Sequence, residues 1–203
     1  MPLSTPSAPK ADLPGSLLID LRNLVASHEA EDFTASDLKR AFLKLPSQIP
    51  KCPDHAQLES VAQALARTVG RNWTNLVGPM ALDSACPWMR EVHAGQDDGA
   101  SLYLNSEPPG ASDIPHEHGT WAVLVGLEGA GCNTIFEMVD IRQRHVRKLA
   151  QRIVTPGDIV VLEADAIHAL DAHGNLPFVS LNLYGSPISS RPSFQQRSYH
   201  RCS

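Results

Sequence analysis

The spacing of apolar residues changes once along the chain, near residue 79. Before that point apolar side chains recur every three or four positions, which is the period of an amphipathic helix. Asp54 is a suitable cap for one of these helices, Leu58, Val61 and Leu65 lie on its inner face, and Gly70 ends it. The predicted helices cover residues 17–25, 38–45 and 58–69. We expect residues 16–78 to form a helical cap on a larger domain, because they are too few to enclose a core of their own.

After residue 79 the pattern becomes one of short β-type runs separated by turns rich in glycine and proline. Many short strands at close spacing predict a sandwich or a barrel, here over residues 79–186. Residues 1–15 are rich in proline, serine and alanine and are expected to be a disordered tail. Residues 187–203 show little apolar pattern and are expected to lie on the surface as a second tail. The predicted strands are 88–93, 101–105, 121–127, 134–139, 159–162, 167–170 and 178–184.

Composition narrows the class of protein. The chain has 203 residues, of which 42% are hydrophobic and 19% charged, as in soluble globular proteins. A net charge of −5 does not indicate binding to nucleic acid, and it disfavours binding to an anionic membrane surface. The first apolar run contains Asp20 and Arg22, unlike the core of a signal peptide. We therefore expect a cytoplasmic protein, a monomer or small homo-oligomer, acting on a small molecule.

The four cysteines, Cys52, Cys86, Cys132 and Cys202, are far apart. Without a C-x-x-C pair they indicate neither a zinc knuckle nor a redox motif. In a reducing compartment they are expected to be free thiols.

The histidines carry the most specific chemistry. His116 and His118 are one residue apart, so on a β-strand both imidazoles would point to the same face. His168 lies on a later predicted strand, which a curled sheet could bring opposite the pair. Three imidazoles without a carboxylate leave a divalent metal with its full charge and with open coordination positions. Such a site suits an anionic ligand together with a small molecule such as O2.

The glycines around these histidines resemble the two metal motifs of the cupin superfamily. Gly110 and Gly129 flank the His116–His118 pair, and Gly157 precedes His168 by eleven positions. The resemblance implies a mainly β fold, the cupin double-stranded β-helix barrel. The second motif departs from the family pattern at three positions where that pattern prefers proline, glycine and asparagine, namely Glu163, Asp165 and Ala172.

Ala122 stands where many cupins have a glutamate ligand. In this respect the chain resembles the thiol dioxygenases, the cupin branch of cysteine dioxygenase and 3-mercaptopropionate dioxygenase, which holds ferrous iron with three histidines. The segments 115–121 (PHEHGTW) and 180–184 (SLNLY) are similar to that branch, and the resemblance covers roughly residues 75–186. It implies Fe2+ held by His116, His118 and His168, and oxidation of a small mercapto acid or cysteine-like thiol to a sulfinate with O2.

The same resemblance implies roles for Ser180, Asn182 and Tyr184. In the branch the matching serine, histidine and tyrosine form a hydrogen-bonded relay, with the tyrosine hydroxyl near substrate and oxygen. Asn182 replaces the histidine. Its amide can still orient Tyr184, but it cannot titrate near neutral pH.

The arginine that binds the substrate carboxylate in this branch has no direct counterpart. The two positions that the branch uses are occupied by Thr74 and Ser193. Arg191, Arg71 and Arg90 are the candidates for a bidentate clamp. The departures indicate a substrate other than plain cysteine, such as a longer or differently substituted thiol acid.

Two other functions remain open at this point. A different three-histidine cupin oxygenase would cleave a carbon–carbon bond of a diketone or a hydroxylated aromatic acid. A non-catalytic cupin would only bind a metal or small ligand, since a fold does not fix a function. Tyr184 and its strand favour the thiol dioxygenase.

Overall fold

The computed structural model describes residues 49–50, 52–69, 87–95, 99–188 and 197–202. This part of the chain contains one helix and short strands connected by turns. The elements are α3 (His55–Val69), β1 (Trp88–His93), β2 (Ser101–Glu107), β3 (Ala122–Glu128), β4 (Ala130–Asp140), β5 (His145–Val154), β6 (Ile159–Leu162), β7 (Ile167–His173), β8 (Phe178–Tyr184) and β9 (His200–Arg201).

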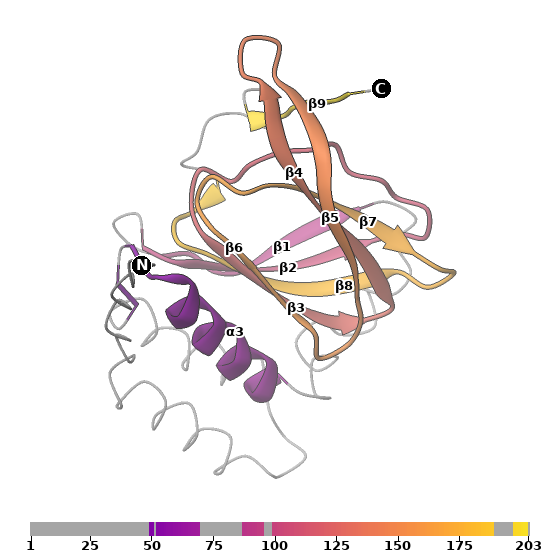
Figure 1. Cartoon of the computed structure of the whole chain (residues 1–203). Helices are drawn as coiled ribbons and strands as arrows, with labels where there is room; N and C mark the ends of the chain where they lie inside the picture. The colour runs from indigo at the N-terminus through magenta and orange to yellow at the C-terminus, as the bar shows by residue number, and fades with distance from the viewer. Residues whose placement is uncertain (1–48, 51, 70–86, 96–98, 189–196, 203) are drawn as a thin grey trace, which may run out of the picture.

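The strands form two sheets that curl toward each other (Figure 1). One sheet has the order β1-β2-β8-β3-β6, and the other has the order β7-β4-β5-β9. The chain passes from one sheet to the other between β3 and β4, between β5 and β6, and again on both sides of β7. This winding gives the predicted double-stranded β-helix barrel. The fold class expected from the sequence is therefore confirmed.

Helix α3 begins with a reciprocal cap. The backbone N–H of Gln57 donates to Oδ1 of Asp54 at 2.8 Å, and the N–H of Asp54 donates to Oε1 of Gln57 at 2.9 Å. This arrangement satisfies N–H groups that the first turn of a helix leaves unpaired. The helix and its cap at Asp54 are confirmed. The predicted helices at 17–25 and 38–45 lie outside the described residues.

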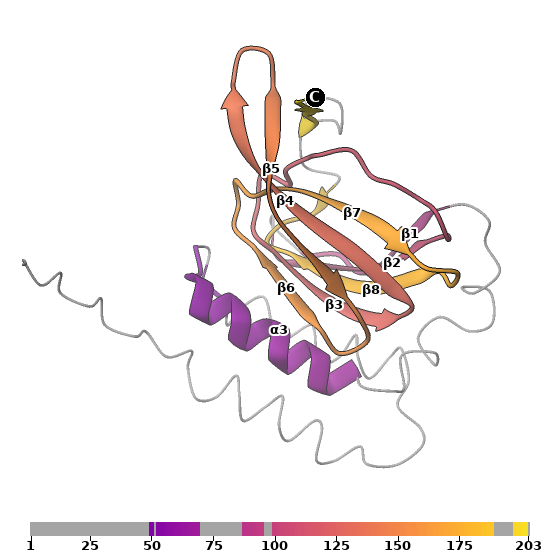
Figure 2. The same ribbon diagram turned by 45° about the vertical axis from the view of Figure 1, so that its right-hand side comes forward.

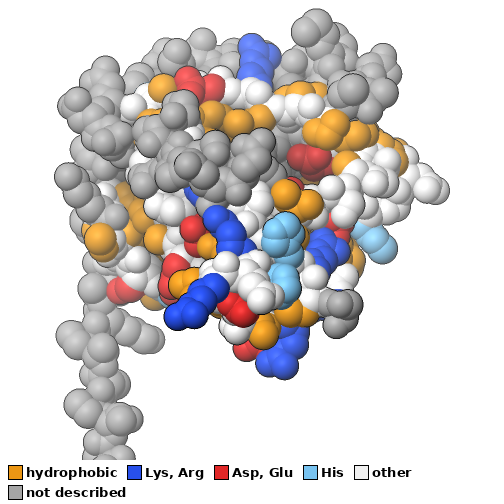
Figure 3. Space-filling view, turned by 90° about the horizontal axis from the view of Figure 1, so that it is seen from above, with side chains coloured by type: hydrophobic (Ala, Val, Ile, Leu, Met, Phe, Trp, Pro, Cys, Tyr) orange, Lys and Arg blue, Asp and Glu red, His pale blue; other side chains and the backbone are white. Residues whose placement is uncertain are grey.

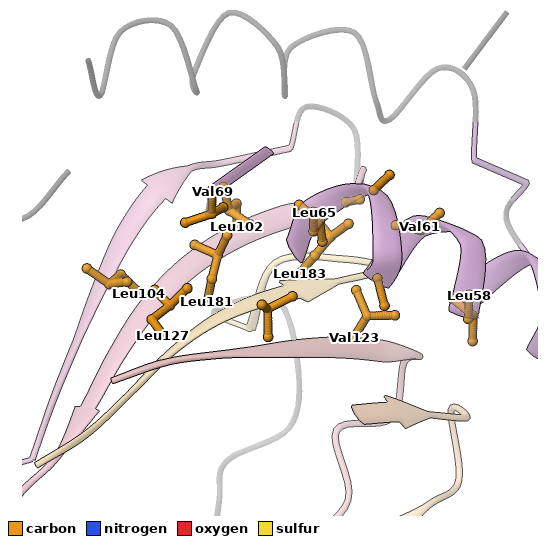
Figure 4. Close-up of a cluster of buried hydrophobic side chains, with 14 of the residues drawn as sticks. Leu58, Val61, Leu65, Val69, Leu102, Leu104, Val123, Leu127, Leu181 and Leu183 are labelled. Carbon is orange, nitrogen blue, oxygen red and sulfur yellow. The ribbon is translucent and has the colours of Figure 1, made fainter. Parts of the chain in front are cut away.

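The apolar face of α3 packs on the outer face of the β2-β8-β3 sheet (Figure 4). Alternation along β8 divides its side chains between two environments. Leu181 and Leu183 point toward the helix, whereas Phe178 and Tyr184 belong to the cluster inside the barrel. The same alternation places Ser180 and Asn182 inside the barrel. Every residue of β8 is buried, so this strand lies at the centre of the molecule.

The second sheet is more open. Seven consecutive residues of β5, from 147 to 153, are exposed. Together with β4 this strand forms a long hairpin that projects beyond the barrel (Figure 2). Seen from that end, side chains of both charges intermingle with histidine and apolar side chains (Figure 3). Among the described residues, the structure holds no helix with the length and apolar character needed to cross a membrane.

The last described segment, residues 197–202, lies within the predicted C-terminal tail and contains a short strand. β9 pairs in parallel with β5, and Ser198 forms a bridge with His116. The N–H of Tyr199 donates to the carbonyl of Pro115 at 2.8 Å. The segment therefore forms an additional strand beside the residues that carry two of the histidines.

Candidate metal centre

Backbone hydrogen bonds bring the first histidine to the third. His116 N donates to His168 O at 2.8 Å, and His168 N donates to His116 O at 2.9 Å. His168 lies on β7, but His116 lies in an irregular segment and forms only isolated bridges, with His168 and with Ser198. The expectation that His116 and His118 share a regular strand is therefore wrong. A bridge on either side of His116 positions the ligand pair in place of a strand.

The three imidazoles converge. Each offers a ring nitrogen, and these nitrogens all lie within 4.8 Å of one another. The Nε2 atoms of His118 and His168 are 2.9 Å apart. All three side chains are buried, with exposed fractions of 6% for His116, 8% for His118 and 4% for His168. A cluster of buried imidazole nitrogens this close together is suited to a divalent transition metal.

Two of the rings are oriented through their other nitrogen. His168 Nδ1 lies 2.9 Å from Oδ1 of Asn133. His116 Nδ1 lies 2.9 Å from the carbonyl oxygen of Ile114 and 3.2 Å from Oδ2 of Asp113. The Ile114 carbonyl and the Asn133 amide oxygen accept a hydrogen bond, so each of these two rings carries its proton on Nδ1 and directs Nε2 toward the cluster. The sequence did not single out Asn133 or Asp113 for these roles.

Burial keeps the imidazoles of His118 and His168 neutral. Desolvation is the largest cause that lowers the pKa of His118, to about 3, and the charges of His116 and Arg197 lower it further. Desolvation also lowers the pKa of His168, with smaller contributions from His116 and His118. At neutral pH both rings are therefore uncharged, with one ring nitrogen unprotonated, as metal ligation requires.

Tyr184 forms a wall of the site opposite β7. Its ring lies edge-on to His118, with centroids 4.8 Å apart, and edge-on to Tyr103 at 5.6 Å. Burial raises its pKa, whereas a hydrogen bond with Asn105 of β2 acts in the opposite direction. The hydroxyl therefore stays protonated across the neutral range.

The predicted relay is only partly present. Asn182 Nδ2 donates to Ser180 Oγ at 3.0 Å, so these two residues are paired as expected. The side-chain hydrogen bond that shifts the pKa of Tyr184 comes from Asn105 on the neighbouring strand. Asn105 lies opposite Ser180 in the β2–β8 register.

The arginines predicted to bind a carboxylate are not brought to the site within the described residues. Arg71 and Arg191 lie outside them. Arg90 is exposed on β1 and pairs with Leu104, whose side chain packs on the helix side of the sheet. Alternation directs Arg90 to that side as well, away from the barrel interior.

Arg197 is the arginine that the structure places beside the histidines. It is 7% exposed, and its Nη1 donates to the carbonyl of Glu117 at 2.6 Å. The N–H of Glu117 donates in return to the carbonyl of Arg197 at 3.0 Å. The positive charge of Arg197 makes a small contribution that lowers the pKa values of both His118 and Tyr184. Sequence analysis missed this residue because its segment has no apolar period.

Comparison with known proteins gives a likeness of fold. No family model and no curated protein matches the chain. Oxalate oxidase in complex with glycolate matches at 17% identity over 51% of this chain and 53% of that chain, with a TM-score of 0.42. The matched region thus spans about half of the oxalate oxidase chain.

Two bacterial structures match in the same way. A double-stranded β-helix protein from Klebsiella pneumoniae gives 13% identity over 51% of this chain and 75% of that chain, with a TM-score of 0.41. The cupin domain of a transcriptional regulator from Enterobacter cloacae gives 18% identity over 50% of this chain and 98% of that chain, with a TM-score of 0.38. At these identities the likeness concerns the fold alone.

Proposed function

We propose that this protein is a non-haem iron(II) dioxygenase that oxidises the thiol of a small mercapto acid to a sulfinate. The observation that carries the proposal is the cluster of three buried imidazoles beside the phenol of Tyr184, without a carboxylate among the ligands. Ala122, at the position of the glutamate found in many cupins, is buried inside the barrel and offers no ligand atom.

The residues fit a ferrous ion. Imidazole nitrogen is a good ligand for iron, and three neutral ligands leave a positive charge that favours a thiolate as the next ligand. When bound, iron would supply the redox chemistry that joins O2 to sulfur. In the net reaction both oxygen atoms end on sulfur, the electrons lost by sulfur reduce O2, and the thiol proton is released to solvent.

Tyr184 would orient the reacting groups. Its Oη is a protonated donor in a buried setting, where a hydrogen bond is stronger than in water. His118 and Tyr103 flank its ring, so the phenol has little freedom to turn away. The apolar side chains of Leu124 and Leu162 complete the barrel interior and exclude water.

Arg197 would pair with the carboxylate of the substrate. Arg197 is buried, and its guanidinium donates to the carbonyl of Glu117, the residue between His116 and His118. The planar fork of donors in a guanidinium matches the geometry of a carboxylate. Arg71 and Arg191, which the sequence predicted for the same role, stay predictions because they lie outside the described residues.

Metal analysis combined with an oxygen-uptake assay tests the proposed activity. The iron-loaded protein is given a panel of thiol acids, thiols without a carboxylate, diketones and gentisate-like acids. Oxygen uptake with thiol acids, accompanied by a sulfinate product, is the expected result. Uptake with diketones or aromatic acids alone would assign carbon–carbon cleavage instead. Tightly held zinc with no turnover after iron loading would assign a non-catalytic metal-binding role.

The same panel tests Arg197. In Arg197→Met we expect a higher KM for thiol acids and little change for thiols that lack a carboxylate, because only the former lose an ionic partner. Iron content is measured alongside, since Arg197 also supports the Glu117 backbone. Equal losses for both kinds of thiol would reject the proposed ionic contact.

A further inference from the structure

A carboxylate lies directly behind one of the three rings. Asp113 Oδ2 is 3.2 Å from His116 Nδ1, and Asp113 Oδ1 accepts the N–H of Ile114 at 2.8 Å. The corresponding nitrogen of His168 faces the uncharged amide of Asn133. Two otherwise similar rings therefore have different groups behind them, a carboxyl group for His116 and an uncharged amide for His168.

Asp113 is held from the side opposite the ring. Asp171 Oδ1 accepts the N–H of Asp113 at 2.9 Å and the hydroxyl of Ser112 at 2.8 Å. Arg201 Nη2 donates to the carbonyl of Asp113 at 3.1 Å and lies 4.0 Å from Oδ2 of Asp171. β7 and the last described segment thus fix the backbone from which this carboxylate reaches the imidazole.

A carboxylate in this position changes the ring as a ligand. A carboxylate oxygen beside Nδ1–H polarises the imidazole and makes the Nε2 lone pair more basic. The Ile114 carbonyl already accepts from the same nitrogen and is enough to fix the tautomer. The additional contribution of Asp113 is therefore its charge, which offsets part of the charge of a buried divalent ion.

We propose that Asp113 is a positioning residue that acts through His116 to set the affinity of the site for divalent ions. This inference rests on the proposed metal centre. The negative charge that many cupins place on a direct glutamate ligand would here lie behind the ring of His116, at its Nδ1. All coordination positions not filled by imidazole then stay open for substrate and O2.

Binding of Co2+ to the full chain provides a test that does not depend on turnover. Dissociation constants are measured by competition with a chromophoric chelator for the parent protein, Asp113→Asn, Asp113→Glu and Asp165→Asn. We expect Asp113→Asn to weaken Co2+ binding about 10- to 100-fold. Asp113→Glu keeps the charge and should remain close to the parent. Asp165→Asn removes an exposed charge elsewhere and should leave the affinity unchanged.

Thermal unfolding of the metal-free proteins shows whether each variant is folded. Parent-like affinity in folded Asp113→Asn would overturn the proposal, as would an equal loss in Asp113→Glu, because the charge would then not matter. If Asp113→Asn does not fold, the Asn133→Asp variant provides the test. A carboxylate behind His168 should tighten Co2+ binding. Unchanged or weaker binding would refute the role of charge. A parent protein that binds no Co2+ would instead refute the metal centre itself.

Discussion

The two sheets of the barrel differ in what covers them. The β1-β2-β8-β3-β6 sheet is enclosed by α3 on one face and by the barrel interior on the other, and β8 is buried throughout. The β7-β4-β5-β9 sheet uses one face for the interior and leaves much of β5 to solvent. Yet His168 and Asn133 come from this second sheet, on β7 and β4. The more exposed sheet thus provides one of the three histidines and the amide that orients it.

Removing a ligand from the second sheet should have the largest effect. His168→Ala is expected to abolish stoichiometric iron, because two imidazoles and a cavity replace the three-nitrogen cluster. Metal content after iron loading is the measurement, with His173→Ala, an exposed histidine at the end of the same strand, as the control. Full metal retention in His168→Ala would show that the ligand assignment is wrong.

A core substitution in the first sheet should mainly affect stability. Leu181→Ala on β8 removes a fully buried side chain and is expected to cost about 2–5 kcal/mol of unfolding free energy. Leu149→Ala on β5 removes a side chain that is 63% exposed and should cost less than about 0.5 kcal/mol. Denaturant unfolding compares the two variants. Equal losses of unfolding free energy in the two variants would show that the two sheets contribute equally to stability despite their different burial.

Tyr184 is the point where the first sheet contributes to the chemistry. Tyr184→Phe keeps the ring but loses the hydroxyl, so we expect oxygen uptake with thiol acids to fall by about 100-fold while iron content stays unchanged. Because burial raises the pKa of this phenol, the rate of the parent protein should show no step from Tyr184 ionisation at neutral pH. Loss of iron in Tyr184→Phe would assign the residue a structural role instead.

The smallest effect is expected at the turn before β6. Hydrogen bonds from Thr155, to which Arg152 adds a favourable charge, lower the pKa of Asp158 below its usual value of 3.8. A lowered pKa stabilises the fold above the unfolded value, and this stabilisation is lost as pH falls through the folded value. Asp158→Asn should cost less than about 1 kcal/mol at pH 7, because the side chain is 42% exposed. The difference from the parent should vanish in acid, and a difference that grew there would contradict the assignment.

Alternating or continuous apolar runs were enough to predict the enclosed parts of the fold. The ranges of β1, β6 and β8 agree with the strands expected from the sequence, and α3 begins directly after its predicted cap. α3, β6 and β8 bury a face, so their sequences carry a period, whereas β1 agrees with its predicted range although three of its residues are exposed. β5 was missed because its residues from 147 to 153 are exposed and carry no such period. Its pairing with β4 is specified by backbone hydrogen bonds across a hairpin.

The three histidines of the candidate site could be predicted from the sequence. The spacing of His116, His118 and His168 relative to glycines was visible in the sequence, and the structure brings the three rings together. Asp113 and Arg197 were not visible. Both depend on pairing between the ligand segment and residues far along the chain, which no local pattern encodes.

The strand bridges around His116 also have a consequence for biosynthesis. Glu117 pairs with Arg197, eighty positions downstream, and the histidine pair needs β7 as well. During translation His116 and His118 are therefore synthesised long before the segments that hold them in place. Because such long-range pairing forms late, the proposed metal site should be completed only after the barrel has closed.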